Sequence, residues 1–365
     1  MKTVVAASCV AFFCYASPSF AQSSVTLFGV LDEGVAYTSN IGGSSVVKTA
    51  SGIRWPTYWG LTGHEDLGGG WSALFNFQSS FNINTGAGSN SSVLFGRLSI
   101  VGIQSEDYGR VTVGRQGDFM NDFLYLVSDR YEYLTTYSMA PGNLDRLAGG
   151  QLSNSVKYRS GLGPGLTFGA MYAFANPGTG TTSNGTGRSF EIRYVNSSMR
   201  MLAVYTNVHA VAVTPASSLG STSFLGYSSS FGSTTAVPLS SLTVAAVGMS
   251  YRYRDATGIV AYTNVRMKSQ RDSGSLQTLT LGGVYQFTPA FLFEGGASTS
   301  RLSSSRWNQV FGTLDYFLSK RTDVYLTGSY EHTSGPGQTA ELALSGGPST
   351  TPSQTIVQVG IKHYF

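Results

Sequence analysis

The feature that most constrains the fold of this chain is a two-residue alternation of apolar and polar side chains. It recurs along the sequence, for example at 25–32, 166–174 and 323–331, where one face is apolar and the other mainly small or polar. A period of two places these two faces on opposite sides of a β-strand. Beyond Gln22 no apolar run is long enough for a spanning helix and no 3.6-residue period is sustained, so the sequence predicts an all-β protein.

Composition excludes several classes of protein. Charged residues make up only 12% of the chain, about half of the ~25% that is usual for soluble domains. The excess of 23 Lys and Arg over 19 Asp and Glu is too small to indicate a nucleic-acid partner. The high counts of tyrosine (21) and phenylalanine (21) argue against a disordered chain.

The first residues predict export. Lys2 precedes an apolar run over 4–16, and Ser19, Phe20 and Ala21 form a small-x-small cleavage site. The run is shorter than the ~20 residues of a membrane-spanning helix, so we expect a signal peptide over 1–21 and a single mature domain over 22–365. Both cysteines fall in the removed part, which excludes a disulfide or a cysteine-ligated metal in the mature chain.

A soluble β-sandwich would also alternate with period two. Three features favour a membrane barrel instead: short and long connections alternate, the faces opposite the apolar ones are polar or glycine-rich, and aromatic residues gather at strand ends. This is the pattern of an outer-membrane barrel, in which closure pairs every backbone group at lipid depth. The short connections are 68–70, 106–109, 163–165, 255–258, 288–289 and 320–322, and the long ones include 176–187, 213–240 and 334–353.

The mature chain contains about sixteen segments of this kind, each long enough for a membrane strand of ~9–11 residues. A barrel of that size encloses water, whereas eight strands enclose only side chains. The segments are about 23–38, 53–66, 70–83, 92–106, 108–117, 152–160, 165–176, 188–197, 199–212, 241–254, 258–269, 274–287, 290–303, 306–319, 322–333 and 353–365.

Five motifs, in order along the mature chain, resemble the general porins of Gram-negative bacteria, especially their β-proteobacterial branch. The motifs are SVTLFGVLD (24–32), GLTGHEDLGGG (60–70), YGRVTVGRQ (108–116), NSVKY (154–158) and VGIKHYF (359–365). The resemblance implies a homotrimer of 16-stranded antiparallel transmembrane barrels in the outer membrane, surrounded by lipid bilayer and lipopolysaccharide. It also implies passive diffusion of small hydrophilic solutes and ions, with no cofactor and no nucleic-acid partner.

The same resemblance implies that a third extracellular loop, about 115–153, folds into the barrel and narrows it. This stretch is acidic and aromatic, and a solvated surface loop is the alternative. In the family, loop acids face arginines across the pore and create a transverse field. Arg97 matches one such arginine. Tyr58 and Gln151 stand where relatives place two others, and Arg54 is a candidate to replace the arginine missing at Tyr58. The ion preference is therefore open. The candidate loop acids are Asp118, Asp122, Asp129 and Glu132.

The alternation of inward and outward side chains along each strand, here called strand parity, predicts further charged side chains in the lumen. Arg97 is expected inside because Leu94, Leu98 and Ile100 are expected to face lipid, and Arg115 is expected outside with Val111 and Val113. Pairing between neighbouring strands is the alternative role for the wall bases. The candidate pore-wall bases are Lys157, Arg159, Arg193, Arg252 and Arg266, and the inward acids are Asp32, Glu191, Glu294, Asp315 and Glu331.

Catalytic motifs are weak. The four histidines are scattered without a metal-ligand spacing, and no Gly-x-Ser-x-Gly elbow occurs. The glycines at 161, 163 and 165 lie between two strands and indicate a turn, not a dinucleotide site. We therefore expect a channel and no enzyme. A substrate-specific channel, which would need an aromatic lining, and an adhesin or receptor barrel remain alternatives.

Overall fold

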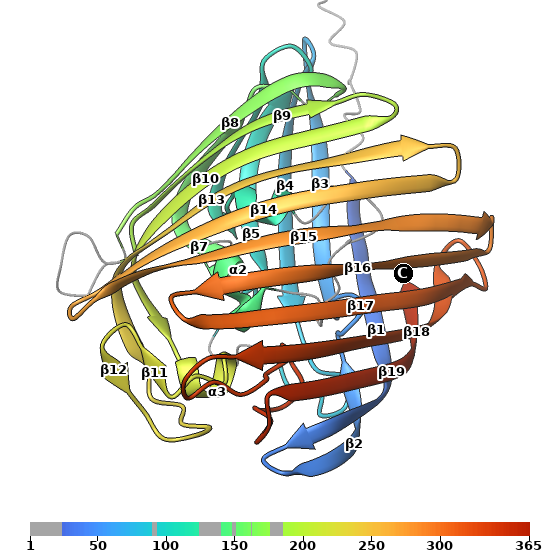
Figure 1. Ribbon diagram of the computed structural model, residues 1–365. Helices are drawn as coiled ribbons and strands as arrows, with labels where there is room; N and C mark the ends of the chain where they lie inside the picture. The colour runs from blue at the N-terminus through green and yellow to red at the C-terminus, as the bar shows by residue number, and fades with distance from the viewer. Residues whose placement is uncertain (1–23, 90–92, 124–139, 148–150, 162, 176–184) are drawn as a thin grey trace, which may run out of the picture.

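A computed structural model describes residues 24–89, 93–123, 140–147, 151–161, 163–175 and 185–365 (Figure 1). The predicted signal peptide and two of the candidate loop acids, Asp129 and Glu132, lie outside these residues. Within the described part, no helix is long and apolar enough to cross a membrane.

Seventeen strands form one antiparallel sheet that closes on itself, because β1 pairs with β19 on one side and with β2 and β3 on the other. The strands are β1 (Ser24–Ile41), β2 (Ser44–Ser51), β3 (Tyr58–Gly68), β4 (Trp71–Ser80), β5 (Leu98–Ser105), β6 (Gly109–Gly117), β7 (Gln151–Arg159), β8 (Gly165–Ala173), β9 (Gly187–Val195), β10 (Met199–Val213), β13 (Val237–Tyr253), β14 (Ala256–Ser269), β15 (Ser273–Thr288), β16 (Phe291–Leu302), β17 (Ser305–Phe317), β18 (Thr322–Ser334) and β19 (Ser353–Tyr364). Since β2 and β3 pair with successive halves of β1, they share one wall position. The predicted 16-stranded barrel is confirmed.

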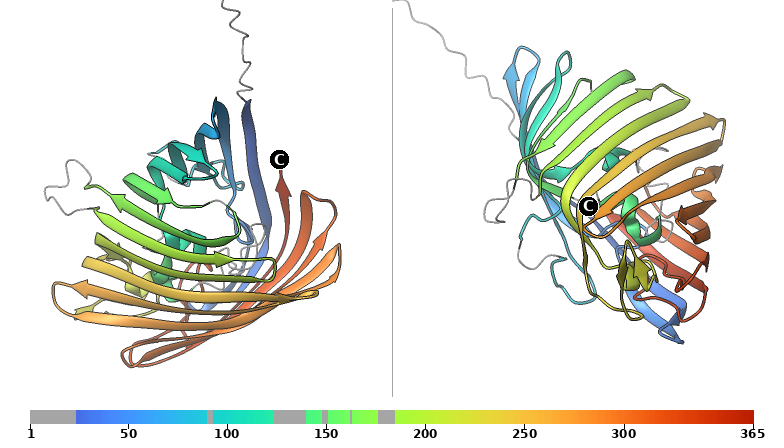
Figure 2. Two further views of the ribbon diagram at one scale, coloured as in Figure 1. Left: turned by 90° about the horizontal axis from the view of Figure 1, so that it is seen from above. Right: turned by 60° about the vertical axis from the view of Figure 1, so that its left-hand side comes forward.

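Short elements lie in the connections. The loop after β6 contains α1 (Phe119–Phe123), η2 (Pro141–Asn143) and α2 (Leu144–Leu147). The loop after β10 contains α3 (Pro215–Ser218) and the hairpin β11 (Ser223–Phe224) and β12 (Tyr227–Ser228). The helical segments of the first loop lie within the ring of strands (Figure 2, right), so the described part of the predicted constriction loop folds inward.

The second wall strand differs from the prediction, which began it at residue 53. The chain already pairs with β1 over β2, leaves the wall at 52–57, and returns as β3. Ile53, Arg54 and Trp55 are all buried, which no alternating strand allows, because the backbone turns into the lumen there. Asp32 holds this indentation: its carboxylate accepts the backbone N–H groups of these three residues at 3.1–3.4 Å.

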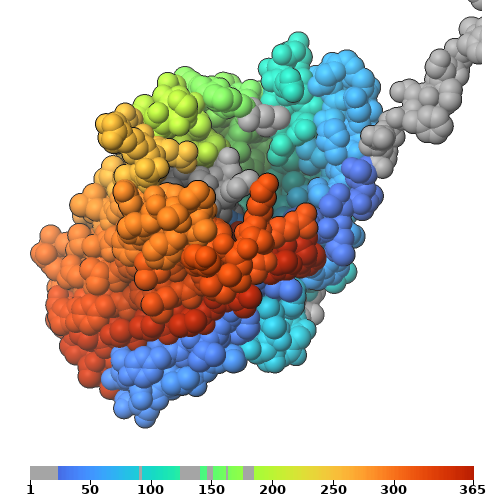
Figure 3. Space-filling view, turned by 90° about the vertical axis from the view of Figure 1, so that its right-hand side faces the viewer, coloured from blue at the N-terminus to red at the C-terminus, as the bar shows by residue number. Residues whose placement is uncertain are grey.

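All the connections predicted to be tight turns lie at one end of the barrel, the end that carries the C-terminus (Figure 1). Figure 3 looks onto this end, where the wall strands surround a central depression. Gly68, Gly69 and Gly70 all have positive φ in the turn between β3 and β4, a conformation that glycine adopts without steric cost. The opposite end carries the long loops, yet the connections 270–272 and 303–304 at that end are also short.

The outer surface is apolar, as predicted: Leu166 and Phe168, for example, are 72% and 57% exposed. The prediction that inward faces are polar or glycine-rich is confirmed on β18, holds only in part on β17, where Trp307 and Phe311 are buried, and is wrong for most of β10, β13 and β14. On these last three strands most inward side chains are apolar, because α1 and the loop after β10 pack on them and exclude water. The shared cluster includes Phe119, Met120, Leu144, Leu202, Val204, Leu219, Leu242, Val244 and Val265.

Candidate pore constriction

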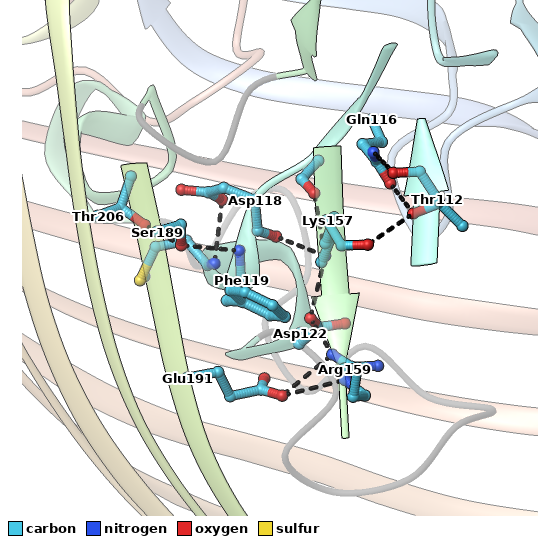
Figure 4. A network of polar contacts seen from close by, with 12 residues as sticks. Thr112, Gln116, Asp118, Phe119, Asp122, Lys157, Arg159, Ser189, Glu191 and Thr206 are labelled. Atoms are coloured by element: carbon cyan, nitrogen blue, oxygen red, sulfur yellow. Dashed lines mark hydrogen bonds and ion pairs between the residues drawn. The ribbon is translucent and has the colours of Figure 1, made fainter. Parts of the chain in front are cut away.

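One charged cluster joins the inward-folded loop to the barrel wall (Figure 4). Lys157 on β7 donates from Nζ to Oδ2 of Asp122 at 3.4 Å and to the carbonyl oxygen of Gly117 at 3.0 Å. Arg159, two residues along β7, pairs with the same Asp122 oxygen and with Oε1 of Glu191 on β9, the latter at 3.1 Å. Two wall cations and one wall carboxylate therefore hold α1 in place.

The ring of Phe119 completes this anchor. Lys157 Nζ lies 4.3 Å and Arg159 Cζ 5.5 Å from the ring centroid, so both cations add cation–π attraction. On the wall side, Gly169 of β8 leaves room for the ring, because a Cβ at that position would lie 2.2 Å from Phe119 Cζ. The backbone N–H of Phe119 donates to Ser189 Oγ at 3.2 Å. The helix is thus seated by both packing and charge.

The loop carboxylates of this cluster have different protonation behaviour. Burial disfavours the charged form of Asp122, but the nearby cations Lys157, Arg159 and Arg193 outweigh it and hold the pKa of Asp122 below its usual value. Asp118 is fully buried, and burial raises its pKa to about 7 against the smaller opposing effects of the Thr206 hydroxyl and Lys157. Asp122 and Glu191 lie within ion-pair distance of Lys157 and Arg159 and offset part of their positive charge, while Arg193 is a further cation beside them.

Asp118→Asn is expected to stabilise the folded barrel at pH 8 and to leave its stability at pH 4 almost unchanged. The folded pKa of about 7 exceeds the ordinary value of 3.8, so the folded state binds the proton more tightly. Its stability therefore falls as the pH rises between these two values. Asparagine removes this dependence. The thermal unfolding midpoint in detergent at pH 4, 6 and 8 measures it, with the exposed Asp66→Asn as the matched control. A difference between variant and wild type that is equal at all three pH values would contradict the assignment.

A second group surrounds a cavity of about 440 Å³ that Arg97, Arg115 and Gln151 line together. Arg97 donates from Nε to Gln78 Oε1 at 3.0 Å, and its guanidinium carbon lies 4.5 Å from the ring centroid of Tyr58. Arg115 donates to the carbonyl oxygen of Gly96 at 2.7 Å and to Ser153 Oγ at 2.8 Å. The structure therefore brings together Arg97, Tyr58 and Gln151, and adds Arg115.

The side-chain alternation from which the sequence oriented Arg97 and Arg115 is wrong. Val101 and Ile103 are the exposed side chains of β5, at 59% and 46%, while Leu98 and Ile100 line an inner cavity of about 230 Å³ with Lys157 and Arg159. Arg97 precedes β5, so strand alternation does not set its direction; its contacts with Gln78 and Tyr58 turn it inward. Arg115, predicted outside, reaches the cavity because the register shifts between Gly114 and Gln116.

Two other predicted site residues lie elsewhere. Arg54 is 1% exposed and its guanidinium pairs with Glu294 at 2.9 Å and Asp315 at 3.4 Å, so it supplies no free charge to the cavity. Arg266 faces outward, since its neighbours Val265 and Met267 on β14 are the buried ones. The register of β14 thus corrects its assignment to the pore wall. Arg193 lies inward beside Glu191, and Arg252 lies on the inward side of β13 near its short turn.

Comparison with known proteins gives a consistent result. A family model described as Gram-negative porin matches residues 4–336. The chain is 28% identical to an outer membrane porin protein of Bordetella pertussis over 233 residues, 57% of this chain and 60% of that protein. It is also 28% identical to outer membrane porin protein 32 of Delftia acidovorans over 368 residues, 95% of each chain.

The fold is similar to that of an anion-selective porin from Comamonas acidovorans, with a TM-score of 0.76. Sequence identity to it is 22%, and the alignment covers 94% of this chain and all of the other. At that identity the likeness supports the barrel architecture and does not by itself transfer a preference for anions.

Proposed function

This chain belongs to the Gram-negative porin family, and from that premise we propose a passive outer-membrane channel that favours anions at a constriction lined by Arg97, Arg115 and Gln151. As in a porin, small hydrophilic solutes and ions cross the closed barrel through water, without a cofactor or an energy source. The short turns then lie on the periplasmic side and the long loops outside the cell. Residues 1–21 are proposed to be the export signal, removed from the mature protein.

One observation carries the proposed anion preference. Two arginines line the cavity of about 440 Å³, and within the described residues its lining contains no carboxylate. In the neighbouring cluster Asp122 and Glu191 pair with Lys157 and Arg159, and Arg193 is a further cation beside them, so this cluster adds no net negative charge that would oppose the anion preference. Fixed charge of one sign in a narrow aqueous passage raises the local concentration of the opposite ion. Tyr58 and Gln151, which stand where relatives place arginines, lower the number of fixed positive charges but do not make the net fixed charge negative.

We propose a homotrimer that uses the outer face of β3 and β4. Trp59, Phe75 and Phe77 form a continuous aromatic surface there with Phe95 from the connection before β5, with ring centroids 5.2–6.0 Å apart. Gly63 lets the Phe75 ring lie against β3, because a Cβ there would meet the ring, and the resulting outward aromatic surface offers an apolar contact to a second subunit. The rest of the outer surface would face lipid.

A substrate-specific channel is the second candidate. Tyr262 and Tyr285 add nothing to a lumenal aromatic lining, because both are exposed on the outer wall. A different aromatic set surrounds a cavity of about 600 Å³ at the periplasmic end, together with the Lys362–Asp323 ion pair of 3.1 Å. Its aromatic members are Trp55, Tyr58, Phe317 and Tyr364. Lys320 also lines this cavity, so its aromatic surfaces and additional cation favour planar anionic solutes.

Swelling of liposomes that contain the purified protein distinguishes these two functions. We expect rates for neutral sugars that fall steadily with molecular mass and rise linearly with concentration, as passive diffusion requires. An aromatic carboxylate that enters with a saturable rate, and that competes with the sugars, would favour the specific channel. Absence of swelling with any of these solutes would contradict both functions.

A further inference from the structure

Arg110, the second residue of β6, is a lumenal cation that lies outside the constriction. It has the inward parity of the buried Thr112, whereas Val113 is exposed on the outer face. The turn at 106–109 belongs to the end of the barrel that we assign to the periplasm, so Arg110 lies on the periplasmic side of the constriction, about 17 Å along the strand from Arg115. An anion that leaves the constriction toward the periplasm therefore meets this side chain.

Within the described residues, Arg110 has no carboxylate partner. Its Nε donates to Gln104 Oε1 at 2.9 Å, and its two Nη groups make no hydrogen bond or ion pair with the described chain. Arg159 on β7 lies directly opposite in the strand register, which places the two Cβ atoms ~5 Å apart. Like charges in this arrangement destabilise a sheet, and an anion bound between them would remove that cost.

The carboxylates that pair with Arg159 leave part of its guanidinium available. The contacts with Asp122 and Glu191 use Nε and Nη2 of Arg159, and its Nη1 donates to no described residue. Glu191 belongs to β9, and β6 and β9 lie on opposite sides of β7 in the sheet. Figure 4 shows Glu191 and Thr112, a residue of β6, on these two sides. The side of Arg159 toward β6 is therefore open to a ligand.

Both arginines line the inner cavity of about 230 Å³. The lining contains three cations, Arg110, Lys157 and Arg159, against one carboxylate, Asp122, which leaves a net charge of +2. Asn121 of α1 adds a side-chain amide whose N–H groups have no partner within the described chain. Guanidinium and amide N–H groups that converge on one space suit the oxygens of an anion, and guanidinium groups bind such oxygens in pairs.

We propose that Arg110 and Arg159 bind a small divalent oxyanion, as a second binding position on the anion path. Two neighbouring guanidinium groups match a ligand with at least two oxygens and two negative charges, whereas chloride or a monocarboxylate neutralises only one of them. The inference deepens the proposed function and rests on it, because it adds a binding step on the periplasmic side of the constriction and names a class of solute. The constriction then selects by the sign of the charge, and this site by its magnitude.

Titration of hydrogen phosphate at pH 8 into a planar bilayer that contains the purified protein tests the proposal through the chloride current. We expect a saturable decrease of the current, because the bound dianion occupies the passage that chloride uses. Arg110→Gln should raise the half-blocking concentration roughly tenfold or more, since the charge-assisted hydrogen bonds of one guanidinium are lost. Arg254→Gln, which removes the same charge from an exposed arginine in the turn between β13 and β14, should be blocked as the wild type is.

Calorimetric titration of the same proteins in detergent measures binding without conduction. The wild type should bind hydrogen phosphate roughly tenfold more tightly than acetate, because the monocarboxylate engages only one guanidinium. Arg110→Lys should recover only part of the affinity that Arg110→Gln loses, since lysine restores the charge without the planar pair of donors.

Equal half-blocking concentrations in wild type and Arg110→Gln would overturn the proposal, as would equal affinities of the wild type for hydrogen phosphate and acetate. A wild type that conducts with chloride preference, yet neither binds phosphate nor is blocked by it, would refute this site and leave the proposed function intact. A wild type without chloride preference would refute the proposed function, and the calorimetric titration would then decide separately whether Arg110 binds the dianion.

Discussion

Replacing Arg97 by Ser is expected to lower the anion-to-cation permeability ratio of the channel about two- to sixfold, since a unit charge ~8 Å from the ion path contributes ~0.2–0.5 kcal/mol with opposite sign for the two ions. Arg97 points into the cavity that Arg115 and Gln151 also line, and it makes no ion pair within the described part of the chain. Its charge is therefore available to permeating ions. The zero-current potential in a KCl gradient measures the change, which should shrink as the salt concentration rises.

Arg266→Ser is the matched control for this prediction. The sequence assigned both arginines to the pore, whereas the structure places Arg266 on the outer face of β14. We expect the control to retain the wild-type ratio. If Arg97→Ser also retained it, or if Arg266→Ser changed it as much, the proposed constriction would be wrong.

Arg54→Met is expected to destabilise the barrel by ~3–5 kcal/mol, the usual cost of removing one partner of a buried ion pair. Glu294 and Asp315 are 3% and 0% exposed and would both lose their guanidinium partner. The indentation at 52–57, which carries Arg54 into the lumen, would also lose its link to the opposite strands β16 and β17. Urea unfolding in detergent, followed by tryptophan fluorescence, gives the change in free energy.

Two further variants separate charge from packing. Adding Glu294→Gln and Asp315→Asn to Arg54→Met should recover much of the lost stability, because the two carboxylates left without the guanidinium are then replaced by neutral amides. Arg321→Met, at an exposed arginine in the turn after β17, should change stability by less than ~0.5 kcal/mol. A loss for Arg54→Met no greater than for Arg321→Met would contradict the buried ion-pair assignment.

The sequence predicted the barrel well because the bilayer imposes one simple rule on its wall. Leu166 and Phe168 face outward as their period-two pattern requires, and the glycines at 68–70 form the turn that their composition indicated. Prediction failed where the wall departs from alternation. The inward turn at 52–57 depends on Asp32, whose carboxylate accepts three N–H groups from residues more than twenty positions away, and no local pattern reports such a contact.

The candidate site was predictable in part. Parity placed Lys157 and Arg159 inside, but their pairing with Asp122 depends on how a long loop returns to the wall. Arg115 was assigned to the wrong side because the register shift beside it is invisible in the sequence. Arg266 was misassigned because a cation near the end of β14 was interpreted as lumenal, although only the pairing of β14 with β13 and β15 fixes its face.

The zero-current potential of the purified wild-type protein in a planar bilayer, measured across a KCl gradient, tests the central claim most directly. We expect discrete conductance steps and a potential of the sign that chloride preference produces. Steps with a potential of the opposite sign would contradict a constriction governed by Arg97 and Arg115, and a protein that inserts without any conductance would contradict the open, water-filled barrel itself.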